Sequence, residues 1–355
     1  MSRPILHQLI IGATPRDAIT QNAILWQSWL QKAGYTSEIF ATSIADECKN
    51  KIRPWDNYQP NEDQKGLLYH HSLGTPIVDQ LLKQHHRHLI PVYHNVTPAR
   101  WFAGSHPELA RLTRLGEAQL KQMASIVPAG IGDSEFNCAE MRTAGFQQAD
   151  VVPITFKADQ FEREQPIPLN IKNDGPLLLF VGRLSPNKCQ EDLVRLLYAC
   201  RQLEPTTQLV LIGSEWMPTY VDWVRYVAEQ LGVTDGVHLL GSVSFAEMAG
   251  AYQAADLYVS LSEHEGFGMP LIESMYFELP VLAYRSTAVT GTLGGASVTV
   301  GRKEYGALAQ LAVKLWRDKE WQQRIVSRQN NQLQKFLELQ VKARFFEVLA
   351  SLGIN

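Results

Sequence analysis

The chain lacks the features that mark several classes of protein. Its 4 cysteines in 355 residues form no Cys-x-x-Cys pair, so neither a disulfide framework nor a zinc site is indicated. Basic residues are not in excess, since 33 Lys and Arg stand against 36 Asp and Glu, which argues against a general nucleic-acid binder. The apolar run at residues 5–11 is too short and too interrupted for a signal peptide or a membrane span. We therefore expect a cytoplasmic globular protein with reduced thiols.

The length and the pattern of apolar runs predict two α/β domains. A chain of 355 residues with 45% hydrophobic residues exceeds one ordinary core. Both halves alternate buried strands with helices, as doubly wound Rossmann-like domains do. We expect an N-terminal domain over 1–160, a polar, proline-containing linker over 161–175 and a C-terminal domain over 176–335. The tail is helical throughout, with a last helix at about 336–355.

In the first half, polar residues follow predicted strands. An opening strand leads to a turn at Gly12, and a strand over 89–93 ends at His94. Residues just past the carboxyl ends of parallel strands lie where open sheets bind ligands. A basic amphipathic helix is predicted over 107–124, followed by a strand-like segment over 125–128.

In the second half, one stretch suggests an anion site. A buried strand over 257–261 is followed by Gly266 and Gly268 and then by a helical segment. A strand, a glycine turn and a helix N-terminus gather free backbone N–H groups, which suits a diphosphate. Two carboxylates, Glu265 and Glu273, bracket the turn. Because like charges repel, these would accept hydrogen bonds from sugar hydroxyls instead of binding phosphate.

Two signatures carry a resemblance to a known family. The segment Glu265-Gly-Phe-Gly-x4-Glu273 resembles the E-x7-E motif of glycosyltransferase family 4, retaining enzymes that use nucleotide-sugar donors. Upstream, the strand over 177–181 leads into Gly182-Arg-Leu-x3-Lys188, which is similar to the family's G-R-L-x3-K pattern. Taken alone, Arg183 and Lys188 would be ordinary solvated charges; their order ahead of the second motif favours a functional pair.

The resemblance implies a B-type fold, in which two Rossmann-like domains face each other and the last helix returns to the first domain. By the family's pattern, Arg183 and Lys188 neutralise the donor diphosphate, Glu273 holds the ribose and Glu265 the sugar hydroxyls. His94 would reach the donor sugar from the first domain. The other donor-binding residues that we expect are Gly12, Gly182, Gly213, Ser242, Val243, Gly266, Phe267, Gly268 and Met269.

The chain departs from the family's pattern at three places. Cys189 stands where many relatives carry glycine, and Asn95 where many carry aspartate. Thr290-Gly291 replaces a common Pro-Glu pair, so no glutamate role is transferred to that loop.

A metal site is not expected. Asp-x-Asp occurs nowhere in the sequence, and the adjacent His70 and His71 would point to opposite faces of a strand. Arg100–Phe102 together with the basic helix could form a membrane-surface patch at the cytoplasmic face, although a solvated helix face is the commoner interpretation.

We therefore expect a retaining hexosyltransferase that uses a GDP- or UDP-linked sugar, with mannose as a first guess. The acceptor would be a glycan or lipid-linked hydroxyl in bacterial surface polysaccharide synthesis. Two alternatives stay open, namely a nucleotide-sugar epimerase of the same fold and a non-catalytic nucleotide-sugar-binding protein. The sequence does not identify the sugar, the base, the acceptor, the linkage or the oligomeric state.

Overall fold

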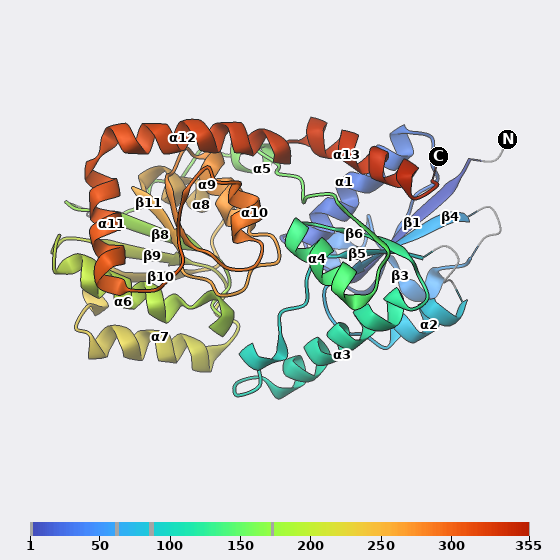
Figure 1. Cartoon of the computed structure of the whole chain (residues 1–355), viewed down its shortest axis with the longest axis horizontal. Coiled ribbons are helices and arrows are strands. Elements are labelled where there is room, and N and C mark those ends of the chain that lie inside the picture. The colour runs from blue at the N-terminus through green and yellow to red at the C-terminus, as the bar shows by residue number, and fades with distance from the viewer. Residues whose placement is uncertain (1–2, 61–63, 85–88, 172–173, 355) are drawn as a thin grey trace. The chain divides into compact units, whose positions relative to one another are not determined.

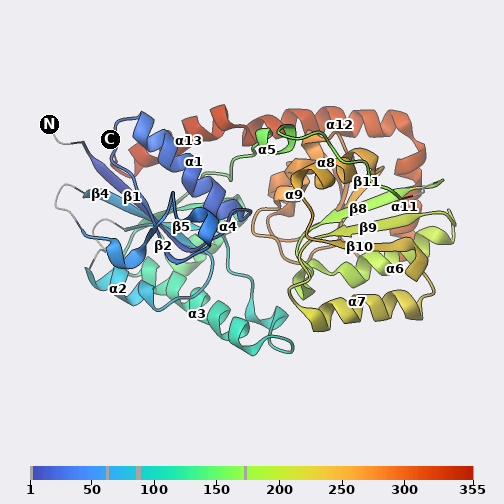
Figure 2. The same cartoon turned by 180° about the vertical axis from the view of Figure 1, so that it is seen from behind.

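The chain forms two compact units in a computed structural model, which describes residues 3–60, 64–84, 89–171 and 174–354 (Figures 1 and 2). Unit 1 combines Met1–Thr155 with Glu338–Asn355, and unit 2 is Phe156–Leu337. Each unit is an α/β layer structure around one parallel sheet. The fold class predicted from the sequence is confirmed.

Unit 1 contains a seven-stranded sheet of order β3-β2-β1-β4-β5-β6-β7 in the described residues, with every pairing parallel. The chain runs outward from β1 to β3 and then restarts at β4 on the other side of β1. The strands are β1 (Ile5–Ala13), β2 (Ile39–Ile44), β3 (Arg53–Pro54), β4 (Gln64–His71), β5 (Leu89–Tyr93), β6 (Ala129–Gly132) and β7 (Gln148–Val151).

Helices cover both faces of this sheet. Successive residues of β4 point to opposite faces, so Leu67 and Tyr69 pack under α2, α3 and α4, whereas Leu68 packs under α1 and α13. Phe345 of α13 lies with its ring centroid 4.4 Å from that of Trp26 in α1. The predicted return of the last helix to the first domain is thus confirmed (Figure 1). The helices are α1 (Ala18–Lys32), α2 (Ile77–Gln84), α3 (Pro107–Ala124), α4 (Glu135–Ala144) and α13 (Glu338–Ser351).

The described residues of unit 2 contain a six-stranded parallel sheet of order β10-β9-β8-β11-β12-β13. The chain proceeds outward from β8 to β10 and then crosses to β11, on the other side of β8. The order of the strands therefore reverses between β8 and β11. The strands are β8 (Leu177–Val181), β9 (Gln208–Ile212), β10 (Val237–Gly241), β11 (Leu257–Ser260), β12 (Val281–Tyr284) and β13 (Val298–Val300).

Both faces of this second sheet are covered as well. Both views show α6 and α7 on one face and α8, α9 and α12 on the other (Figures 1 and 2). The helices are α5 (Asp159–Glu162), α6 (Gln190–Arg201), α7 (Pro218–Gln230), α8 (Phe245–Ala254), α9 (Met269–Tyr276), α10 (Val289–Leu293), α11 (Tyr305–Arg317) and α12 (Lys319–Leu333).

One segment differs from what the sequence suggested. Residues 125–128 form no strand, because the N–H groups of Ser125 and Val127 close the end of α3 by donating to the carbonyls of Lys121 and Met123. The strand that follows is β6. The linker expected over 161–175 stays a prediction, and unit 2 begins at Phe156.

No helix in the described residues is long and apolar enough to cross a membrane.

Candidate functional site

The predicted diphosphate-binding segments meet at the reversal of strand order in unit 2. Arg183 and Lys188 follow β8, and Glu265 to Gly268 follow β11. Since β8 and β11 are adjacent and parallel, both loops leave the same edge of the sheet. Open α/β sheets bind ligands outside the carboxyl ends of their strands at such a reversal. The two signatures, about 80 residues apart in the sequence, therefore belong to one site.

Asn187 joins the two loops. Its backbone carbonyl accepts from the N–H groups of Glu263 (2.9 Å) and His264 (3.3 Å), and its side-chain amide donates to the carbonyl of His264 at 3.1 Å. The hydroxyl of Ser185 donates to its Oδ1 at 2.8 Å. Asn187 is buried, so these bonds are shielded from water. Sequence reasoning missed this residue, whose only local signal is its place in the Ser-Pro-Asn-Lys turn.

Lys188 and Glu265 form an ion pair as a result. Lys188 Nζ lies 2.5 Å from Glu265 Oε2, and the side chains are 15% and 13% exposed. The backbone of Glu265 is fixed by Thr287, whose hydroxyl accepts from its N–H at 2.8 Å and donates to its carbonyl at 2.7 Å. Thr287 has a φ of 35°, a conformation that a β-branched residue adopts only when its surroundings hold it there. Thr287 is a second residue that sequence reasoning missed.

The N-terminus of α9 adds an anion-binding element beside this pair. Gly268 has a φ of 90° and is the residue before the helix. The backbone N–H groups of Phe267, Gly268 and Met269 donate to no acceptor in the part of the chain that the structure describes. Unpaired N–H groups at the positive end of a helix dipole attract phosphate. The role of this turn in binding a diphosphate stays a prediction.

Arg183 is exposed and forms no ion pair within the described residues. Its guanidinium lies 5.6 Å from the ring centroid of Trp216, in the loop after β9, which orients it without neutralising it. Nearby, a Cβ on Gly213 would lie 2.0 Å from the carbonyl oxygen of Gly182, so only glycine fits at 213. This glycine thus has a packing reason that is independent of any ligand.

Glu273 lies inside α9 and is buried, with 8% exposure. Its Oε2 accepts from the hydroxyl of Tyr252 at 2.7 Å. Burial raises the pKa of Glu273 to about 7, and the bond from Tyr252 opposes that shift. Its other oxygen, Oε1, receives no hydrogen bond from the described chain. Glu273 therefore keeps one acceptor position open.

The remaining predicted donor-binding residues are more loosely placed. Ser242 is exposed and Val243 is partly buried in the loop after β10, the edge strand two positions from β8. Gly12 belongs to unit 1, where it lies within β1 and is exposed. A Cβ at Gly12 would meet no atom within 4 Å, so packing does not require glycine there.

His94, predicted to contact the sugar, is enclosed in unit 1. Its side chain is 1% exposed, its Nδ1 lies 2.7 Å from Asp133 Oδ2, and its Nε2 lies 2.7 Å from His70 Nδ1. His70 Nε2 in turn contacts Gln8 Oε1 at 3.1 Å, and Gln8 Nε2 donates to the carbonyl of Ala23 at 2.9 Å. Both ring nitrogens of His94 are thus occupied by the protein.

The direction of these hydrogen bonds fixes the protons. The carbonyl of Ala23 can only accept, so Gln8 presents its oxygen to His70, and His70 must donate through Nε2. Burial lowers the pKa of His70 well below its usual value, so it is neutral and accepts from His94 Nε2–H. A further proton then lies between His94 Nδ1 and Asp133. Burial raises the pKa of Asp133, whereas His94 lowers it. The buried pair carries no net charge.

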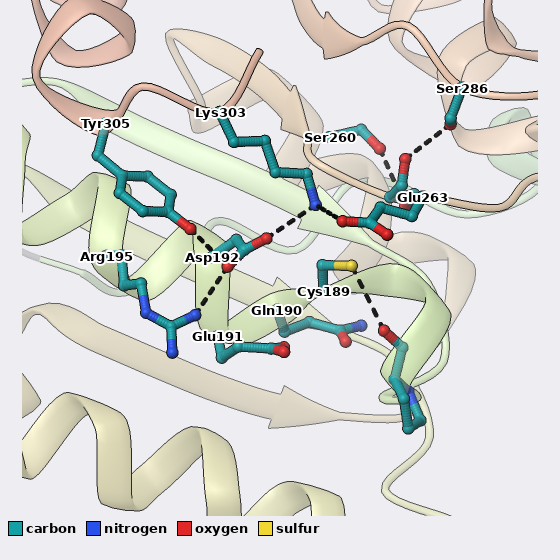
Figure 3. A network of polar contacts seen from close by, with 12 residues as sticks. Cys189, Gln190, Glu191, Asp192, Arg195, Ser260, Glu263, Ser286, Lys303 and Tyr305 are labelled. Carbon is teal, nitrogen blue, oxygen red and sulfur yellow. Dashed lines mark hydrogen bonds and ion pairs between the residues drawn. The ribbon is translucent and has the colours of Figure 1, made fainter. Parts of the chain in front are cut away.

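One group in the described residues has the spacing of a metal site. The ligand atoms of Cys189, Asp192 and Glu263 all lie within 4.8 Å of one another. However, Lys303 Nζ lies 2.8 Å from Asp192 Oδ2 and 2.8 Å from Glu263 Oε1. An ammonium group therefore already bridges the two carboxylates (Figure 3).

The departures from the family's pattern have local explanations. Cys189 has a φ of 53°, the left-handed conformation that glycine adopts most readily. Asn95 has a φ of 76°, and its amide donates to Glu140 at 2.6 Å. Thr290-Gly291 forms part of α10. In the suggested membrane patch, Phe102 is buried, so it offers no apolar surface to a membrane.

The comparisons with known proteins agree with this geometry. Residues 161–332 match the family described as "Glycosyl transferases group 1". The D-inositol 3-phosphate glycosyltransferase of Segniliparus rotundus is 28% identical over 74% of this chain and 55% of its own length. The GDP-mannose:cellobiosyl-diphosphopolyprenol alpha-mannosyltransferase of Xanthomonas campestris is 34% identical over 38% of this chain and 36% of its own. This chain thus spans about half or less of these relatives.

Among solved structures, the sucrose-phosphate synthase of Thermosynechococcus elongatus has a similar fold, with a TM-score of 0.76 at 17% identity. The match covers 99% of this chain and 99% of that one. That likeness extends over both units, whereas the family match lies in unit 2. Residues 161–332, which include Lys188 and Glu265, are thus similar to the group 1 glycosyltransferases.

Proposed function

We propose that this protein transfers a hexose from a nucleoside-diphosphate sugar to a hydroxyl group of a glycan or lipid-linked acceptor, with retention of the anomeric configuration. The observation that carries the proposal is the placement of Lys188 and Glu265 beside three N–H groups that donate to no acceptor among the described residues, at the strand reversal of unit 2. A cation and helix amides suit a diphosphate, and a carboxylate suits sugar hydroxyls.

The names of the relatives support the finer choices. One relative is named for GDP-mannose and for a diphosphopolyprenol acceptor, which favours mannose and a lipid-linked acceptor in surface polysaccharide synthesis. Another is named for D-inositol 3-phosphate, so an acceptor bearing phosphate is an alternative. We propose GDP-mannose as the first donor to test and UDP-linked hexoses as the second.

In the proposed reaction, the bond between sugar and phosphate breaks while negative charge grows on the departing diphosphate. Arg183, Lys188 and the amides of Phe267 to Met269 would stabilise that charge, because they are already oriented when the reaction begins. Glu273 would bind the ribose through its open oxygen.

The ion pair changes what is expected of Glu265. Lys188 cannot serve a diphosphate fully while Glu265 holds it, so the donor would draw Lys188 toward phosphate and leave Glu265 for the sugar. The predicted sugar contact of His94 has no support of this kind, because both of its ring nitrogens are bonded within unit 1. It stays a prediction.

The proposal is tested by incubating the purified protein with GDP-mannose or a UDP-hexose, with and without a polyprenyl-diphosphate-linked disaccharide. We expect release of the nucleoside diphosphate and elongation of the acceptor, with the new linkage in the donor's anomeric configuration. An epimerised donor formed without acceptor would instead indicate an epimerase. Binding of donor with neither reaction would indicate a non-catalytic protein.

The variant Glu265→Gln sharpens this test. It removes the partner of Lys188 and the charged acceptor for the sugar while keeping the side chain's shape. We expect the affinity for GDP or UDP to stay equal or to rise, and transfer to be impaired. A weaker affinity for the diphosphate alone, measured by titration calorimetry, would contradict the roles proposed for the pair.

We further propose that the reaction needs no divalent metal, because cationic side chains and helix amides would take that part. Transfer is measured after exhaustive chelation and is expected to be unchanged. Loss of activity that added magnesium or manganese restores would contradict this.

A further inference from the structure

Lys303 lies outside the two signatures, in the loop after β13, yet its side chain turns inward. It is 13% exposed, and its Nζ bridges Asp192 and Glu263 at 2.8 Å each. The same ammonium lies 5.1 Å from the ring centroid of Tyr284. Figure 3 shows the ammonium group of Lys303 between the carboxylates of Asp192 and Glu263.

Asp192 is held from the other side as well. Its Oδ1 accepts from the hydroxyl of Tyr305 at 2.7 Å and from Arg195 Nη1 at 2.7 Å (Figure 3). Burial alone would lower the pKa of Lys303, but the hydrogen bonds to the two carboxylates raise it, so the side chain stays charged. The cluster is therefore an organised network with Lys303 as the cation between Asp192 and Glu263.

The two carboxylates lie next to the two loops of the proposed diphosphate site, one in the helix that follows the first loop and one within the second loop. Asp192 lies in the first turn of α6, four residues after Lys188. Glu263 lies two residues before Glu265, in the loop after β11. Without a cation between them, two negative groups whose oxygens lie within 4.8 Å would repel each other. That repulsion would act on the loops that place the Lys188–Glu265 pair.

We propose that Lys303 is a positioning residue of the diphosphate site, which holds the loop of Glu263 against the first turn of α6 and thereby sets Lys188 and Glu265 in register. This inference rests on the proposed function of that site. Lys303 itself lies on neither signature, and it acts through Asp192 and Glu263. Its removal should therefore weaken recognition of the diphosphate more than recognition of the nucleoside.

The chain offers a matched control. Arg201 has a side chain that is 12% exposed, pairs with Asp235 at 2.7 Å and donates to the carbonyl of Thr207 at 3.0 Å. These partners precede β10 and β9, so the pair lies at the amino ends of the strands, at the other edge of the sheet. Arg201→Met thus removes a buried cation of unit 2 without touching the proposed site.

The experiment titrates UDP and GDP, and then the matching nucleoside, into the wild-type chain and into Lys303→Met, Lys303→Arg and Arg201→Met. For whichever diphosphate the wild type binds, we expect Lys303→Met to lose about tenfold in affinity, with less than a twofold change for the nucleoside. Lys303→Arg should recover most of the loss, since arginine also bridges carboxylates. Arg201→Met should bind the diphosphate with the affinity of the wild type, even if its melting temperature falls as much as that of Lys303→Met.

The double variant Lys303→Met/Glu263→Gln tests the cause. Removing one of the two negative charges should restore part of the diphosphate affinity that Lys303→Met loses. The amide of glutamine can also donate a hydrogen bond to Asp192. The inference is overturned by an unchanged affinity in Lys303→Met, by an equal loss for the nucleoside or in Arg201→Met, or by a double variant no better than the single one. A wild-type chain that binds neither UDP nor GDP would instead contradict the proposed function.

Discussion

The two units each hold a close pair of ionisable side chains at the carboxyl ends of their strands, and the pairs differ in what surrounds them. The His94–Asp133 pair of unit 1 has an interatomic distance of 2.7 Å and side chains that are 1% exposed. The Lys188–Glu265 pair of unit 2 has a distance of 2.5 Å, but its side chains are 15% and 13% exposed. Both nitrogens of the His94 ring are used inside the fold, whereas Lys188 lies beside N–H groups that have no acceptor in the described part of the chain.

This difference separates a group that stabilises the fold from one that can serve a ligand. Short contacts between ionisable side chains are common to both pairs, so a short contact does not by itself identify a binding site. What distinguishes unit 2 is hydrogen-bonding capacity that the protein leaves unused at a partly open position. The following variants test that distinction, beginning with the largest expected effect.

Asp133→Asn should destabilise the protein by about 3–5 kcal/mol, because breaking one side of a buried pair leaves the other without its partner. Chemical denaturation measures the loss, and Asp46→Asn is the control, since the Asp46–Lys49 pair is exposed and should contribute less than about 1 kcal/mol. Affinity for the nucleoside diphosphate should not change in the folded protein. A marked loss of that affinity would indicate that the His94 network takes part in binding.

Lys188→Ala should lower the transfer rate by about 10²–10³, as expected when one preorganised stabilising group is removed from a developing charge. Binding of the bare nucleoside should change little. Steady-state rates are compared with those of Lys314→Ala, an exposed lysine of α11 that lies over Trp321. An unchanged turnover number would make Lys188 an ordinary surface charge.

Glu273→Gln should weaken the affinity for the nucleoside diphosphate about tenfold above pH 7, because a hydrogen bond from the ribose to a charged acceptor contributes roughly 1.5–3 kcal/mol. With a pKa of about 7, the wild-type carboxyl is mostly protonated at pH 6, so the gap between the two proteins should narrow there. Calorimetry at both pH values measures it. A gap that does not depend on pH would contradict the role of the charge.

The same raised pKa has a consequence for stability. The folded protein holds the proton of Glu273 more tightly than the unfolded chain, whose glutamates titrate near 4.5. Stability is therefore lost as the pH rises from about 4.5 through about 7, by about 3 kcal/mol. Glu273→Gln should not lose this stability, because glutamine does not ionise. Its melting temperature should therefore exceed that of the wild type at pH 8 and equal it near pH 4. An increase in melting temperature of equal size at pH 8 and at pH 4 would contradict this link between the raised pKa and stability.

Cys189→Gly should be more stable than Cys189→Ala by about 1 kcal/mol, which reverses the usual order of the two residues. The reason is the left-handed backbone at this position, with φ 53° and ψ 47°. Thermal denaturation of the two variants measures the difference. The usual order, with alanine more stable, would show that the backbone relaxes around residue 189.

The sequence predicted the regular elements of the fold better than the contacts of the site. The strands over 177–181 and 257–261 were visible because buried parallel strands are continuous apolar runs. The segment over 125–128 was mistaken for a strand because its apolar residues close a helix instead. The strand β13 and the helix α10 were missed, since they are three and five residues long.

The contacts of the candidate site were less visible in the sequence. Motif spacing selected Arg183, Lys188, Glu265 and Glu273 as candidates, whose roles stay predictions, but it did not indicate the contact between Lys188 and Glu265, which are 77 positions apart. That contact depends on Asn187 and Thr287, whose bonds to the other loop leave no periodic signal. The enclosure of His94 was equally invisible, because it requires Gln8, His70 and Asp133 from three other strands or their ends.

The return of α13 to unit 1 has a consequence for how the protein is made. Unit 2 is one unbroken stretch, whereas the core of unit 1 includes Val341, Phe345, Val348 and Leu349 from the far end of the chain. During vectorial synthesis, which usually lets the N-terminal domain fold first, the ribosome must translate all of unit 2 before unit 1 receives these side chains. Trp26 and Trp29 would meanwhile face solvent or a chaperone, so the first unit to begin synthesis is the last to finish folding.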